Sequence, residues 1–194
     1  VGLRLVFPLL TLGVAVLCAE RGFGLLHAFG VPPELSVVAG VAVLDLAIYG
    51  QHVLLHKVGF LWRLHRMHHT DLDVDVTTGV RFHPLEILLS ESIKMAVAAA
   101  AGVPPVSVLF FEVLLNGMSL FNHGNLRLPG AIDGTLRLFI ITPDMHRVHH
   151  SIVVEEGNNN YGFSVPWWDR LFGTYRAQPA AGHEGMTIGV RDFF

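Results

Sequence analysis

The chain has 194 residues, of which 52% are hydrophobic and 15% are charged, and its formal net charge is −3. A soluble domain carries about 25% charged residues, so this composition indicates a chain solvated largely by lipid and excludes intrinsic disorder. The single cysteine excludes a disulfide scaffold, and the lack of a basic block in the sequence excludes a nucleic-acid-binding protein.

Four segments are apolar enough to form tilted membrane-spanning helices: residues 5–19, 35–55, 85–101 and 106–121. The sequence GVPP at 102–105 predicts a hairpin between the last two, because proline cannot continue a helix. We therefore expect an all-α integral membrane bundle of about four transmembrane helices, folded as one domain over residues 1–194. The alternative for 5–19 is a cleaved signal peptide, although no A-x-A cleavage site follows it. Since the chain begins with Val1, a missing upstream piece stays open.

The distribution of basic residues predicts an orientation for these spans. Four Lys and Arg residues lie in 56–84 and six follow Phe121, whereas the loops on the opposite side hold only Arg21. The excess of positive charge on cytoplasmic loops therefore predicts that both termini and a histidine-rich helical cap are cytoplasmic.

Histidine is the unusual residue of this chain, with 12 copies. On a helix, residues three or four apart share a face, while adjacent residues diverge by about 100°. An H-x-x-H-H motif can therefore contact two metal ions, and two such motifs with an H-x-x-x-H pair predict a two-metal centre. One H-x-x-H-H alone equally fits a hydrated helix face, and imidazole suits Fe, Zn, Cu and Ni alike. Ten histidines form the local groups: His52 and His56; His65, His68 and His69; His83; His123; and His146, His149 and His150.

The roles of several other residues have alternative interpretations. His27 and His183 stand alone and are predicted not to bind metal. Asp45 and Glu112 lie in apolar segments, where each either neutralises a metal or a polar network or pairs with Lys94. The apolar side chains at 110, 111, 114, 115 and 120 form either an acyl or sterol slot or a lipid-facing helix surface.

Metal-binding histidines need an acceptor for the second ring nitrogen, and nearby carboxylates are the candidates. The three aspartates at 71, 73 and 75 fit a solvated loop equally well. The candidates are Asp71, Asp73, Asp75, Asp144, Asp169 and Glu86.

Taken in order, the three histidine boxes resemble those of the fatty acid hydroxylase/sterol desaturase superfamily of membrane-bound oxygenases. The flanking sequences are similar too: RFHPLE at 81–86, FNHGNL at 121–126, NYG at 160–162 and WDRLFGTY at 168–175. The resemblance is strongest over 48–176. Some relatives carry a further histidine where this chain has Met118 and Ser119, which leaves the coordination number open.

This resemblance implies an oxidoreductase that uses two iron ions, O2 and two electrons to hydroxylate or desaturate a C–H bond of a fatty-acyl, sterol or related lipid. Zinc can replace iron in the protein as purified. The resemblance gives the ligand role to His52, His56, His65, His68, His69, His123, His146, His149 and His150, while His83 is either a tenth ligand or a supporting residue.

The sequence has no nucleotide-binding glycine motif, no cysteine cluster and no room for a haem domain, so a separate electron-transfer protein is expected beside the lipid substrate and the membrane. Two alternatives stay open: a zinc-dependent membrane metalloenzyme of non-redox type, and a membrane metal transporter or metal-binding protein. The expected location is a bacterial inner membrane, with the endoplasmic reticulum as the alternative.

Overall fold

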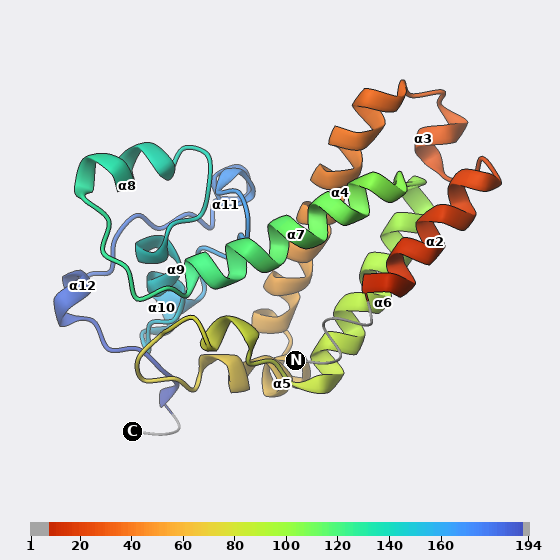
Figure 1. The fold of residues 1–194 in the computed structure, drawn as a ribbon. Helices are drawn as coiled ribbons and strands as arrows, with labels where there is room; N and C mark the ends of the chain where they lie inside the picture. The colour runs from red at the N-terminus through yellow and green to blue at the C-terminus, as the bar shows by residue number, and fades with distance from the viewer. Residues whose placement is uncertain (1–7, 192–194) are drawn as a thin grey trace. The chain divides into compact units, whose positions relative to one another are not determined.

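The computed structural model describes residues 8–191, and the regular elements within this range are helices (Figure 1). Ser151 and Ile188 add an isolated antiparallel bridge. The predicted all-α fold is therefore confirmed. The chain divides into two compact units: unit 1 holds residues up to Gln51 and Pro84–Leu115, and unit 2 holds His52–His83 and the residues from Asn116 onward. The folding of 1–194 as a single domain stays a prediction.

Unit 1 is built from long helices, two of which continue into unit 2. Proline is the first residue of α2, α4, α6 and α7, a position where its missing N–H has no partner to lose. Figure 1 shows α2 lying along α6, and the two pack together. The helices are α2 (Pro8–Glu20), α3 (Leu25–Ala28), α4 (Pro33–Lys57), α6 (Pro84–Ala101) and α7 (Pro105–Asn122).

The chain turns between α6 and α7 as predicted, and this turn packs tightly against the turn after α2. Gly102 has φ +69°, and a Cβ there would lie 2.6 Å from the carbonyl oxygen of Phe23. A Cβ on Gly24 would lie 2.2 Å from the amide nitrogen of Gly102. Both positions therefore require glycine, because the turn after α2 and the turn after α6 touch through their backbones.

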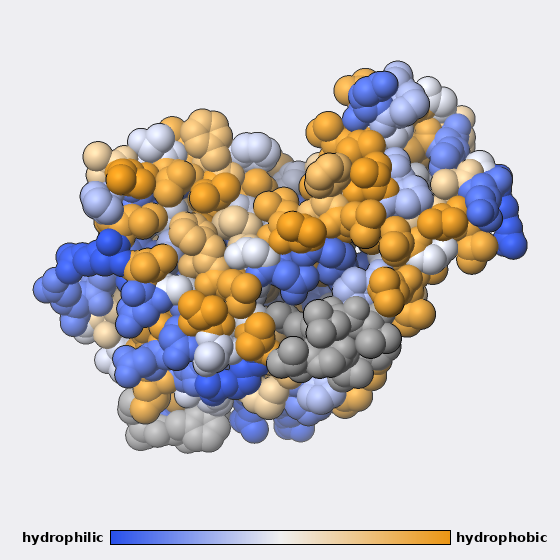
Figure 2. Space-filling model, in the orientation of Figure 1, coloured by the Kyte–Doolittle hydropathy of each residue, from blue (hydrophilic) through white to orange (hydrophobic). Residues whose placement is uncertain are grey.

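Within residues 8–191, three helical segments are long and apolar enough to cross a membrane: Pro8–Ala28, Pro33–Lys57 and Pro105–Asn122. Figure 2 shows hydrophobic residues gathered over the helices of unit 1. The predicted first span starts within residues 1–7, which lie outside the described residues. Helix α6 has the expected length but carries Glu86, Glu91 and Lys94, so a fourth span there stays a prediction.

The charges of α6 are enclosed within unit 1. Lys94 is 3% exposed and pairs with Glu91 of its own helix at 2.5 Å and with Glu112 of α7. The hydroxyl of Thr11 in α2 donates to the other oxygen of Glu91 at 3.1 Å. The expected pairing of Glu112 with Lys94 is confirmed, and this cluster joins α2, α6 and α7 by buried polar contacts.

Removing the cation of this cluster should be strongly destabilising. In Lys94→Met, two carboxyl groups remain buried without their cation, and breaking a buried pair in this way costs about 3–5 kcal/mol. We expect a clear fall in the melting temperature of the detergent-solubilised protein. The triple variant Glu91→Gln/Lys94→Met/Glu112→Gln should recover most of the loss, and equal melting temperatures for wild type and Lys94→Met would contradict this account.

Unit 2 combines the ends of α4 and α7 with short helices and long connections. Helix α9 packs against α10 and α12. The other elements are held by side-chain-to-backbone hydrogen bonds, and together they surround the histidines. The helices are α5 (Gly59–His69), the 3-10 helix η1 (Thr78–Val80), α8 (Gly130–Leu136), α9 (Pro143–His149), α10 (Val154–Gly157), α11 (Trp167–Phe172) and α12 (Gly182–Gly185).

Candidate metal centre

Unit 2 brings nine of the ten candidate histidines into two groups. In each group one ring nitrogen of every member lies within 4.8 Å of those of the others. The groups adjoin, since the rings of His69 and His150 stack with centroids 4.4 Å apart. The five-histidine group is His52, His56, His65, His69 and His149, and the four-histidine group is His68, His123, His146 and His150.

Helix geometry explains how each H-x-x-H-H motif contributes to both groups. His65 and His69 of α5 enter the five-histidine group, while His68 enters the four-histidine group. The motif of α9 divides the other way, with His146 and His150 in one group and His149 in the other. Residues four apart differ by about 40° around a helix and residues three apart by about 60° in the opposite sense. The prediction that one motif reaches two metal positions is thus supported in geometry.

The tautomers of these histidines indicate that a cation belongs between them. The Nδ1 atom of His68 donates to the carbonyl oxygen of Thr78 at 3.1 Å, and that of His123 donates to the carbonyl oxygen of Ser119 at 2.6 Å. Each neutral ring then has only a lone pair on Nε2. Yet the two Nε2 atoms lie 3.0 Å apart and are fully buried.

Two lone pairs at this distance repel unless a positive charge lies between them. A proton is disfavoured there, because burial lowers the pKa of His68 well below its usual value. A divalent transition metal ion supplies the positive charge instead, since neutral imidazole is its common nitrogen ligand. The residues present therefore fit a metal ion in the four-histidine group, and the Nε2 atoms of His52 and His65 lie equally close, 3.0 Å apart, in the five-histidine group.

Backbone carbonyls orient these rings. Besides His68 and His123, His52 donates from Nδ1 to Tyr161 at 2.7 Å, and His149 donates from Nδ1 to Asn159 at 2.8 Å. The expectation of carboxylate acceptors is wrong for these four histidines. Carbonyl acceptors fix the ring and its tautomer in the same way.

Three of the carboxylates expected in that role have other partners. Asp71 pairs with Arg81 and accepts from the Thr78 hydroxyl at 2.5 Å, while Asp75 accepts from Thr77. Asp144 pairs with Arg147 at 2.5 Å. Asp71 thus contacts Thr78, the residue whose carbonyl oxygen accepts a hydrogen bond from the candidate ligand His68.

Asp169 holds the loop that carries the acceptors of His52 and His149. Its carboxylate accepts from the amides of Tyr161 and Gly162 at 2.8 and 2.9 Å and from the Thr174 hydroxyl at 2.7 Å. Burial raises the pKa of Asp169 to about 6 against the opposing effect of these hydrogen bonds. The carboxyl group is therefore mainly ionised at pH 7 and accepts all three.

Asn160 completes the same loop. It is fully buried with φ +53°, and its amide donates to the carbonyls of Met145 and Arg176. Asparagine tolerates this left-handed conformation better than most residues. The NYG and WDRLFGTY sequences therefore form one support for two metal-facing rings.

The buried histidines should make the metal-free protein sensitive to acid. Burial lowers the pKa of six histidines outside the apolar spans, so the native state takes up protons only at lower pH than the unfolded chain does. Because the unfolded state binds more protons below pH 6.5, the free energy of unfolding falls as the pH drops, by about 1.4 kcal/mol per pH unit for each histidine held neutral. These are His65, His68, His69, His146, His149 and His150.

Melting temperatures of the chelator-treated protein at pH 7.5, 6.5 and 5.5 test this expectation. We expect a progressive fall over this range. A melting temperature independent of pH would show that these histidines are hydrated in the metal-free state.

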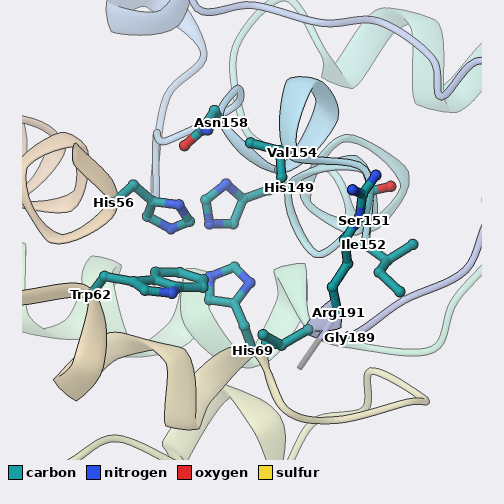
Figure 3. Close-up of a pocket in the computed structure, with 12 residues that line it drawn as sticks. His56, Trp62, His69, His149, Ser151, Ile152, Val154, Asn158, Gly189 and Arg191 are labelled. Carbon is teal, nitrogen blue, oxygen red and sulfur yellow. The ribbon is translucent and has the colours of Figure 1, made fainter. Parts of the chain in front are cut away.

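A cavity of about 340 Å³ lies beside the five-histidine group (Figure 3). Three of the grouped histidines, His56, His69 and His149, form part of its wall. Trp62, Ile152, Val154 and Val190 add apolar surface, and Asn158 and Arg191 add polar groups. Its volume lies within the range of small-molecule sites, so a small molecule in the cavity can reach the five-histidine group while unit 2 stays folded.

Three histidines lie outside both groups. His83 is half-buried before α6, His27 is exposed in α3, and His183 lies in α12, 4.0 Å from Asp144. The structure thus does not bring His83 to the other candidates, and a ligand role for it remains an untested prediction. The sequence analysis did not select Trp62. The available signal was helical spacing, since Trp62 precedes His65 by three residues and Arg66 by four.

The comparisons with known proteins agree with this geometry. The family model for fatty acid hydroxylase matches residues 37–174, a segment that contains every histidine of both groups. The chain belongs to the fatty acid hydroxylase family. Within this family, the histidine boxes of α4, α5 and α9 are the segments that the structure gathers into the two groups, so the predicted resemblance is confirmed.

Relatives of this fatty acid hydroxylase family member are named for lipid oxidation. An ornithine lipid hydroxylase of Rhizobium tropici is 32% identical over 148 residues, 76% of this chain and 44% of the relative. The alkylglycerol monooxygenase of Homo sapiens is 29% identical over 149 residues, 77% and 32% of the two chains. The cholesterol 25-hydroxylase of Rattus norvegicus is 26% identical over 153 residues, 76% and 50%.

The chain matches only a third to a half of the length of these relatives. No solved structure matches it. With three apolar segments and relatives that act on lipids, the chain is a membrane protein of this family.

Proposed function

We propose that the protein hydroxylates a C–H bond of a lipid, with two iron ions held by the two histidine groups and O2 as co-substrate. The observation that carries the proposal is the pair of adjoining groups in which buried neutral imidazoles turn lone pairs toward one another. The names of the relatives, which are hydroxylases and monooxygenases, favour hydroxylation over desaturation.

The nine grouped histidines would hold the metal pair. Such a pair supplies the oxidising power to break an unactivated C–H bond, which acid–base side chains do not have. The chain's own contribution is positioning: the carbonyls of Ser119, Asn159 and Tyr161 orient three rings. Burial of eight of the nine ligand side chains also limits the entry of water.

The overall reaction sets the requirements for partners. One lipid R–H, one O2, two electrons and two protons give R–OH and one water, so the reaction needs a reductant, which we propose is a separate electron-transfer protein. The substrate is an apolar lipid of fatty-acyl, sterol or related type. We place the histidine-rich unit and both termini on the cytoplasmic side of a bacterial inner membrane, following the distribution of basic residues.

Metal analysis combined with single-turnover chemistry tests the proposal. The purified protein should hold about two irons per chain after anaerobic loading, and dithionite reduction followed by O2 should yield a hydroxylated lipid from added membrane extract. The same protein loaded with zinc should give no product, because zinc has no redox chemistry. Product from the zinc form, or none from the iron form with any extract, would contradict the assignment.

A further inference from the structure

Helix α5 places one aromatic ring between the metal site and the surface. His65, His68 and His69 are buried on one face of this helix. Trp62 is half-buried and lies within about 20° of His69 around the helix axis, at the border of that face. Arg66 and Arg63 follow on the outer side, about 40° and 100° from Trp62.

Trp62 packs directly on the five-histidine group. Its ring centroid lies 5.0 Å from that of His56, 5.4 Å from that of His69 and 6.3 Å from that of His65. Figure 3 shows the indole beside His69 and facing the same cavity as His56 and His149. The indole therefore joins an accessible cavity to three rings of one metal position.

The helix segment that carries Trp62 is rich in basic residues. The segment 57–70 contains Lys57, Arg63 and Arg66 and has no acidic residue. Lys57 and Arg63 are exposed, and exposed Arg191 lines the cavity together with Trp62. We call Lys57, Trp62, Arg63, Arg66 and Arg191 the Trp62 surface.

We propose that the Trp62 surface is the docking site of an acidic one-electron carrier protein, and that the Trp62 ring is the point where electrons enter the five-histidine group. The inference rests on the proposed function, which requires an external reductant. Charge complementarity favours such a carrier, because opposite charges steer encounter and fix orientation.

The electron balance is simple. In each docking event the reduced carrier loses one electron and a ferric ion at the histidine groups becomes ferrous. Two events therefore deliver the two electrons that one hydroxylation consumes, while the two protons come from solvent.

The experiment uses the full chain, loaded with iron, in nanodiscs of zwitterionic lipid. The probe is a plant-type [2Fe–2S] ferredoxin, which is acidic, and cytochrome c serves as a basic carrier for binding only. Dissociation constants are measured against salt concentration, and the rate of metal reduction by bound reduced ferredoxin is followed by stopped flow. Reduction by dithionite and the iron content are measured in parallel.

Two variants separate docking from electron entry. Lys57→Glu/Arg63→Glu should weaken ferredoxin binding at least about tenfold and flatten its salt dependence, because reversed charges repel the carrier. At a saturating ferredoxin concentration, Trp62→Leu should slow reduction by bound ferredoxin at least about tenfold, with the rate of Trp62→Phe between those of wild type and Trp62→Leu. Arg21→Glu, an exposed charge in the loop after α2, is the matched control and should resemble wild type.

Several results would overturn the proposal. Ferredoxin binding that is insensitive to the charge reversal, or equal binding of cytochrome c, would remove the docking site. If Trp62→Leu loses iron or is also slow with dithionite, the ring supports the ligands instead of passing electrons. If Lys57→Glu/Arg63→Glu lost binding to vesicles of anionic lipid but bound ferredoxin as wild type does, the Trp62 surface would be a membrane contact instead.

Failure of the proposed function gives a different pattern. In that case dithionite-reduced wild type would form no product with O2, whatever the behaviour of the Trp62 variants. Docking and reduction rates are measured without lipid turnover, so they decide the inference independently.

Discussion

His149→Ala should remove both metal binding at the five-histidine group and lipid hydroxylation. His149 is fully buried, lies in contact distance of the rings of His52 and His56, and has its tautomer set by Asn159. Loss of an outer-sphere partner alone costs about 10–100-fold in metal affinity or activity, so loss of a ligand should exceed about 100-fold. Iron per chain and single-turnover product yield are the measurements.

Two other histidines provide matched controls for this substitution. His183→Ala removes an imidazole from unit 2 that belongs to neither group, and it should keep about two irons per chain and normal product. His83→Ala should also keep its metal, since the structure leaves His83 outside both groups. Loss of one iron in His83→Ala would establish the ten-ligand set instead, and retention of both irons in His149→Ala would contradict the five-histidine assignment.

The histidine set was predictable from sequence because it depends on local geometry. His52 with His56 and the two H-x-x-H-H motifs have helical spacing, and helices α4, α5 and α9 form where these motifs lie. Spacing along one helix also explains why each H-x-x-H-H motif divides between the two histidine groups. It does not reveal which group a histidine joins, because that depends on how separate helices face each other.

The supports of the histidines were not predictable in the same way. The sequence offered carboxylates such as Asp144, but a backbone carbonyl is present at every residue and has no sequence signal. Only the folded loop at 159–161 shows that two carbonyls reach His52 and His149. The number of membrane spans is hard to predict for a related reason. The charged residues of α6 lower its hydropathy, although Lys94 and Glu91 are buried and pair with each other.

The second large effect is expected from the substitution Asp169→Asn, which disturbs the 159–161 loop and not the metal ligands directly. In Asp169→Asn, one acceptor oxygen becomes an N–H donor facing a backbone N–H donor, so a buried amide of Tyr161 or Gly162 loses its partner. An unsatisfied buried donor costs about 1–3 kcal/mol, and more when the lost acceptor was charged. The melting temperature should therefore fall in both the metal-free and the metal-loaded protein.

The same substitution should also weaken metal binding, because the displaced backbone carries the carbonyl that orients His52. We expect a loss of about 10–100-fold in metal affinity, measured by competition with a chelator. Thr174→Val removes only the hydroxyl hydrogen bond to Asp169 and should cost about 1 kcal/mol with little effect on affinity. Normal affinity in a destabilised Asp169→Asn protein would separate loop stability from ligand orientation. A parallel loss of both would show that the WDRLFGTY sequence acts at the metal site through the two carbonyls of the 159–161 loop.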